Sequence, residues 1–133
     1  MATPSSARSP VQHARRPTFL NFARIRFPVG SLASIGHRMS GVLLLVALPF
    51  AALALERSLA GEAAFSSLAE KLQSPLGRVA LAGLAWAAAQ HLFAGVRHLL
   101  MDVGIGSSLR AGRASAYAVL ASGALVGAAA LLA

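Results

Sequence analysis

The chain has 133 residues, of which 56% are hydrophobic and only 12% are charged, and its mean hydropathy is +0.66. A soluble domain carries about 25% charged residues, so this composition indicates one domain of a membrane protein. The net charge of +8 does not indicate nucleic-acid binding, because much of it precedes the first apolar segment and little soluble chain remains to build a basic face. The absence of cysteine excludes disulfides and iron–sulfur ligation within this chain.

The N-terminal region is polar and basic. Residues 1 to about 20 are rich in Ser, Pro and Arg without periodicity, which predicts a flexible cytoplasmic tail and leaves a transit peptide as the alternative. Residues 22–28 then alternate apolar and basic side chains. This alternation predicts a segment along the membrane surface, with the arginines at the lipid headgroups and Phe27 pointing inward. We place the membrane domain at residues 21–133.

Three apolar segments predict three transmembrane helices, at about 31–56, 76–101 and 114–133. The uncharged run from Met39 to Leu55 has 17 residues, whereas about 20 are needed to cross the hydrocarbon layer. The first helix must therefore begin near Ser31 or Ser34, and Pro49 is expected to kink it without ending it. The polar stretch 56–75 predicts an external loop with a short surface helix at about 63–72. The fold class is an all-α membrane protein with three transmembrane helices in a bundle.

The distribution of bases predicts the orientation of these helices. Arginines flank the N-terminal side of the first span and the turn at 102–113, so both are expected to be cytoplasmic and the C-terminus outside. This orientation gathers six polar residues at the cytoplasmic membrane face: Ser34, His37, Arg38, Arg97, His98 and Asp102. His91 lies about 10 Å deeper, because seven residues separate it from His98 at 1.5 Å each.

A histidine deep in an apolar span is costly and indicates a functional site. Neutral imidazole is a common axial ligand of haem iron, and the cations at the membrane face lie at the level of haem propionates. Ser34 and Arg38, four residues apart, share a helix face and could hydrogen-bond a quinone carbonyl. The residues alone also allow simpler interpretations, namely that His91 packs in the bundle and that Arg38 and Arg97 reach for the interface.

Two separated stretches resemble one known family. Residues 34–41 (Ser-Ile-Gly-His-Arg-Met-Ser-Gly) and 91–102 (His-x3-Gly-x-Arg-His-x2-Met-Asp) are similar to two signatures of the cytochrome b556 membrane-anchor subunits of succinate dehydrogenase. The segments Arg16-Pro17 and 25–28 (Ile-Arg-Phe-Pro) also resemble the entry segment of that family. The resemblance covers residues 16–133, and Gly36 departs from it where a bulky apolar residue is usual.

This resemblance implies a place in complex II, in the lipid bilayer, with a flavoprotein, an iron–sulfur protein and a second hydrophobic anchor as partners. By position, His91 would be one axial ligand of a haem b whose other histidine comes from the partner anchor. His37 and Arg38 would meet the haem propionates, with Arg97 and His98 in support. Ser34 and Arg38 would line the ubiquinone pocket, with Phe27 and Ile35 nearby. The subunit would not be catalytic alone but would help to pass electrons from succinate oxidation to quinone, in the respiratory chain and the tricarboxylic acid cycle.

Other functions fit the sequence less well. An anchor of a fumarate reductase-type enzyme is the nearest alternative, although a second haem would need more deep histidines. A cofactor-free structural helix bundle would not need repeated pairing of His with Arg, and a transporter or channel would need more polar residues within the spans. The compact length favours the bacterial inner membrane over the mitochondrial one.

Overall fold

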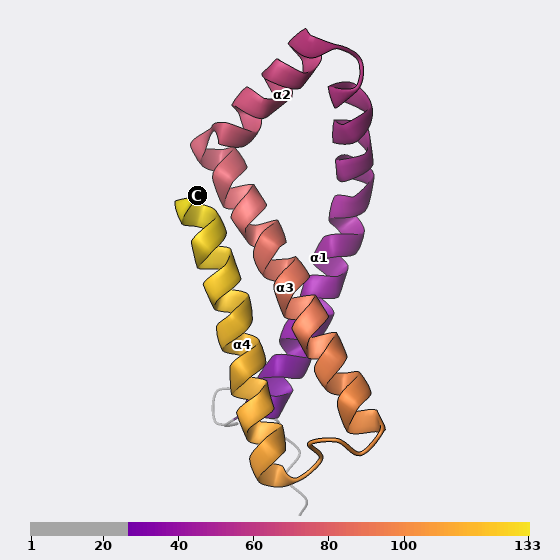
Figure 1. Cartoon of the computed structure of the whole chain (residues 1–133), viewed down its shortest axis with the longest axis vertical. Coiled ribbons are helices and arrows are strands. Elements are labelled where there is room, and N and C mark those ends of the chain that lie inside the picture. Colours follow the sequence, from indigo (N-terminus) through magenta and orange to yellow (C-terminus); the bar gives the residue numbers. More distant parts are fainter. Residues whose placement is uncertain (1–26) are drawn as a thin grey trace, which may run out of the picture.

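The computed structural model describes residues 27–133, which form four α-helices and no strand (Figure 1). The helices are α1 (Val29–Ser58), α2 (Glu62–Gln73), α3 (Pro75–Asp102) and α4 (Leu109–Leu132). The predicted tail at 1–20 and the arginines of the surface segment lie outside the described residues.

The three longest helices, α1, α3 and α4, are long and apolar enough to cross a membrane. This arrangement confirms the predicted all-α membrane fold with three spans. α2 has only 12 residues and joins the C-terminal end of α1 to the N-terminal end of α3, where the sequence predicts a short surface helix. α1 continues through Pro49 without ending.

The largest difference from the sequence prediction is the start of α4. The helix begins at Leu109, five residues before the predicted span at 114, because Ser108 caps it. The Ser108 hydroxyl accepts a hydrogen bond from the backbone N–H of Ala111, one of the donors that the first turn of a helix leaves unpaired. Arg110 and Arg113 therefore lie in the first turns of α4. A span predicted from an uncharged apolar run leaves these two charged residues out.

α3 is the central helix of the bundle. α4 runs antiparallel beside it, and α1 crosses it a little past its middle (Figure 1). The buried residues at these crossings are mostly small, so the helix backbones approach closely. They include Ala33 and Ser40 of α1, Ala87 and Ala94 of α3, and Ala116 and Gly123 of α4.

The C-terminal half of α1 packs much less against the rest of the bundle. Both of its buried residues, Ala33 and Ser40, precede residue 41, and beyond that point α1 diverges from α3 (Figure 1). Its large apolar side chains there are exposed, as Leu45 and Phe50 show. In a bilayer such a surface can face lipid, because lipid tails are as apolar as leucine.

Candidate functional site

Three histidines meet where α1 crosses α3. The rings of His37 and His91 are stacked, with centroids 4.3 Å apart and an interplanar angle of 20°. The ring of His98 lies on the other side, with its centroid 5.2 Å from that of His37 and a tilt of 46°. We call His37, His91 and His98 the histidine cluster. Two residues of α3 that are two turns apart are thus bridged by one residue of α1.

Two glycines give these imidazoles room to lie between the helices. A Cβ atom on Gly41 would come within 2.9 Å of Cε1 of His91, and one on Gly95 would lie 3.4 Å from Nε2 of His37. Each glycine lies four residues after the histidine of its own helix, one turn along the same face. Because α1 and α3 run in opposite directions, the ring of His91 packs on Gly41 of α1 and the ring of His37 packs on Gly95 of α3.

A hydrogen bond fixes which nitrogen of His91 is available to a ligand. Nδ1 of His91 lies 3.1 Å from the backbone carbonyl oxygen of His37, which also accepts a hydrogen bond of 2.9 Å from the Ser40 hydroxyl. A carbonyl can only accept, so Nδ1 carries the proton and donates it, and the lone pair of the neutral ring is on Nε2. The chain's own backbone thereby sets the tautomer in which histidine binds a metal through Nε2.

Nε2 is the ring nitrogen of His91 that the hydrogen bond to the His37 carbonyl leaves for a ligand. A Cβ on Gly41 would lie 4.0 Å from this nitrogen, compared with 2.9 Å from Cε1 and 3.2 Å from Nδ1. The donor set therefore fits a haem iron bound at this nitrogen. Within residues 27–133 no group of three or more His, Cys, Asp or Glu side chains could hold a metal ion, so a metal here would need other ligands.

The histidine cluster is tighter than the sequence suggests. The sequence predicts His91 alone beneath a polar group at the membrane face. In the structure the ring of His37 instead lies directly on it, because α1 and α3 cross at this level. Spacing along one helix cannot reveal this contact, which depends on the crossing of two helices.

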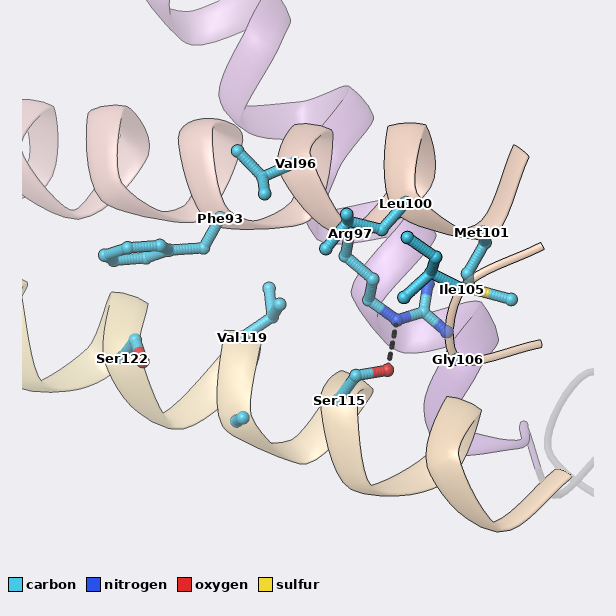
Figure 2. Close-up of a pocket in the computed structure, with 11 residues that line it drawn as sticks. Phe93, Val96, Arg97, Leu100, Met101, Ile105, Gly106, Ser115, Val119 and Ser122 are labelled. Atoms are coloured by element: carbon cyan, nitrogen blue, oxygen red, sulfur yellow. Dashed lines mark hydrogen bonds between the residues drawn. The ribbon is translucent and has the colours of Figure 1, made fainter. Parts of the chain in front are cut away.

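Arg97 is directed at α4 rather than at the histidine cluster. Its Nε donates to the Ser115 hydroxyl at 3.0 Å, and its Nη2 donates to the carbonyl of Gly112 at 3.1 Å. Figure 2 shows this side chain reaching from α3 across a cavity of about 280 Å³ that apolar residues of both helices line. Arg97 therefore fixes the start of α4 against α3, a role that its place in the sequence motif did not indicate.

The residues expected at the quinone site lie in the first turns of α1 and just before it. Ser34 is half-buried, whereas Phe27, Ile35 and Arg38 are exposed. Arg38 borders an open apolar depression on the surface of α1, formed with Met39, Val42, Leu43 and Val46. Together these residues offer an apolar wall with a guanidinium at its edge.

Sequence reasoning did not assign a role to two further residues of this region. Gly41 supports the ring of His91, and Gln90 is fully buried between α1 and α4. The only sequence signal for Gln90 was an amide within an apolar span, and nothing in the spacing showed which helices would cover it.

Comparison with known proteins identifies the family of the chain. Residues 12–130 match the family of succinate dehydrogenase/fumarate reductase transmembrane subunits. The chain is 38% identical over 108 residues to a succinate dehydrogenase cytochrome b556 subunit of Coxiella burnetii, covering 80% of this chain and 86% of the relative. It is 30% identical over 111 residues to the protein of the same name from Paracoccus denitrificans, covering 84% and 85%.

Proposed function

This chain belongs to the family of succinate dehydrogenase/fumarate reductase transmembrane subunits, and on that premise we propose that it anchors complex II and holds one side of a b-type haem. Its relatives are named cytochrome b556 subunits of succinate dehydrogenase, and its three apolar helices suit a multi-pass protein of the bacterial inner membrane. Electrons from succinate oxidation would pass through the complex to quinone.

The observation that carries this proposal is the hydrogen bond from Nδ1 of His91 to the carbonyl of His37. It leaves Nε2 as the lone-pair nitrogen and holds the ring in one orientation, as metal-binding histidines require. Haem b supplies a one-electron store when bound. His91 would provide one axial ligand, and a histidine of a second hydrophobic anchor subunit would provide the other.

The polar groups around His91 suit the charged edge of a haem. His37 and His98 lie beside His91 in the histidine cluster, and Arg38 follows His37 on α1. Cations and N–H donors at this level can bind the propionate carboxylates. Arg97 would have a supporting role beside the propionates, because two of its N–H groups already donate hydrogen bonds to α4.

Ubiquinone would bind along the start of α1. Ser34 can donate a hydrogen bond to a carbonyl of the quinone, and Arg38 can stabilise the negative charge that builds on it during reduction. Phe27 and Ile35 are exposed apolar side chains that would contact the ring or its tail. The partner subunits would complete this pocket, and an iron–sulfur protein carrying electrons from a flavoprotein would dock on the same side.

The orientation proposed for the bundle puts this pocket at the cytoplasmic side of the membrane. The N-terminal arginines and those in the first turns of α4 would then be cytoplasmic, in accordance with the excess of Lys and Arg on the cytoplasmic side of membrane proteins. The iron–sulfur and flavoprotein subunits would meet the membrane on that side.

A reduced-minus-oxidised absorption spectrum of the purified membrane complex tests the haem assignment. We expect a b-type α band in the wild type and in His98→Ala, and its loss in His91→Ala. An unchanged band in His91→Ala would move the axial ligand to another residue. No band in any of the three proteins would leave a haem-free anchor and return His91 to packing.

A further inference from the structure

Gln90 is a buried side chain to which no role has been given. It is 1% exposed, and neither its amide nitrogen nor its amide oxygen has a hydrogen-bond partner among the described residues. It lies immediately before His91, near the middle of a transmembrane helix. Burying an amide without hydrogen-bond partners is unfavourable, so the presence of Gln90 here calls for an explanation.

The contacts of Gln90 are with glycines on both neighbouring helices. A Cβ on Gly36 of α1 would lie 2.9 Å from Nε2 of Gln90, and a Cβ on Gly123 of α4 would lie 2.6 Å from Oε1. The amide thus occupies space that any side chain at either glycine would fill. The amide therefore lies between the backbones of α1 and α4 at two positions that lack side chains.

Gln90 also continues a regular series of contacts between α3 and α4. One turn earlier on α3, Trp86 packs on Gly127, where a Cβ would lie 2.9 Å from the Cβ of Trp86. Trp86 and Gln90 are four residues apart on α3, and Gly127 and Gly123 are four residues apart on α4. The two contacts therefore follow one another along the antiparallel interface of the two helices. These contacts fix the rotation of α3 about its axis relative to α4.

That rotation determines where His91 points. Consecutive residues of an α-helix are separated by about 100° around the axis. With Gln90 fixed between α1 and α4, His91 is turned toward the crossing with α1, where its ring meets Gly41 and its Nδ1 meets the His37 carbonyl. A different rotation of α3 would break that hydrogen bond and change the direction of Nε2.

We propose that Gln90 is the positioning residue for His91, acting by its shape between Gly36 and Gly123 to set the rotation of α3. The inference rests on the proposed function, because it assumes that His91 binds the haem iron. Since the amide has no partner within the described chain, its bulk is what matters, and an unbranched apolar side chain of similar volume should replace it.

The test is to compare variants in the intact purified complex, with two measurements that report on the axial ligand. These are the electron paramagnetic resonance signal of the oxidised haem and its midpoint potential, taken with the haem content per complex. We expect Gln90→Ala to shift both signals, because the gap lets α3 rotate. Gln90→Met should keep the wild-type values.

Changes at Gly123 give an independent test in case Gln90→Ala does not assemble. Gly123→Ala should shift both haem signals, because the new Cβ would press on the Gln90 amide. The double variant Gln90→Ala/Gly123→Ala should lie closer to the wild type than Gly123→Ala alone, since the removed side chain makes room for the added methyl group. Gly83→Ala is the matched control on α3, because a Cβ there meets nothing within 4 Å.

Three results would overturn the inference. Wild-type haem signals in both Gln90→Ala and Gly123→Ala would show that the pair does not position His91. A shift in Gln90→Met as large as that in Gln90→Ala would show that the amide binds a polar group. A wild-type complex without haem would overturn the proposed function as well, whereas haem that is lost in His91→Ala but unchanged in the Gln90 and Gly123 variants would overturn only this inference.

Discussion

The imidazole of His91 lies against Gly41, where a Cβ atom would come within 2.9 Å of ring carbon Cε1 and 3.2 Å of Nδ1. We therefore expect Gly41→Ala to weaken haem binding and Gly41→Val to abolish it, because the ring must leave its hydrogen bond to the His37 carbonyl. Overpacking of this kind typically costs about 1–3 kcal/mol. Haem content and the thermal denaturation midpoint of the complex measure the effect.

Substitutions at two other glycines serve as comparisons for this prediction. A Cβ on Gly95 would lie 3.4 Å from Nε2 of His37, so Gly95→Ala should have a smaller effect than Gly41→Ala, and Gly83→Ala should have none on haem content. A complex of Gly41→Val with full haem content would contradict the close packing of His91 on α1.

Ser115 accepts a hydrogen bond from the Arg97 guanidinium, and its removal should loosen the start of α4. Hydrogen bonds to charged groups contribute about 1.5–3 kcal/mol, so Ser115→Ala should lower the denaturation midpoint of the complex. Arg97→Lys should lower it at least as much, because one ammonium cannot reproduce both bonds of the planar guanidinium.

Ser122→Ala is the control, since Ser122 lines the same cavity as Arg97 (Figure 2). Equal midpoints for Ser115→Ala and Ser122→Ala would show that the bond from Arg97 does not stabilise the helix pair. A change in haem potential in Arg97→Lys without a change in stability would return Arg97 to a role at the propionates.

Ser34 and Arg38 are expected to affect quinone and not succinate. Loss of one hydrogen bond of about 1.4 kcal/mol corresponds to a factor of about ten, so Ser34→Ala should raise the KM for quinone by roughly that factor. Arg38→Leu should lower kcat as well, because the guanidinium acts on charge that develops during reduction.

Two controls isolate that effect. Reduction of a soluble dye by succinate bypasses the quinone site and should be unchanged in both variants. Ser58→Ala, at the opposite end of α1, should leave the KM for quinone at its wild-type value. If Ser34→Ala and Ser58→Ala give the same KM, the quinone does not contact Ser34.

The proposed orientation can be tested by labelling, because the chain has no cysteine of its own. A membrane-impermeant maleimide added to spheroplasts with an intact inner membrane should label Glu62→Cys, on α2 at the outer end of the bundle. Ser107→Cys, in the α3–α4 turn, should react only after the membrane is opened. The reverse pattern would place the N-terminal side of α1 outside.

Much of the fold follows from the composition of the segments. The three spans are visible in the sequence because a helix in lipid must be about 20 apolar residues long. The helix α4 begins five residues before the predicted span, since Ser108 caps the helix and Arg110 is still part of it. Hydropathy reports where a chain can lie in lipid, whereas a cap determines where its backbone hydrogen bonds begin.

The site was less accessible to sequence reasoning, because its contacts join different helices. Helix periodicity relates His91 to His98, but it does not place the ring of His37 between them. The direction of Arg97 toward Ser115 depends in the same way on how α4 is rotated against α3. Spacing along one helix does not carry that information.

If His91 holds a haem as proposed, its position along α3 determines how much of the membrane voltage an electron must cross to reach that haem. His91 lies eleven residues before Asp102, about 16 Å at 1.5 Å per residue, in a helix of 28 residues whose length is about 42 Å. Moving one charge across a whole membrane at 100 mV changes its energy by about 2.3 kcal/mol, so an electron that enters from the Asp102 end feels less than half of this. Reduction of a haem held at His91 should therefore depend on the membrane voltage less than half as steeply as a transfer across the whole membrane.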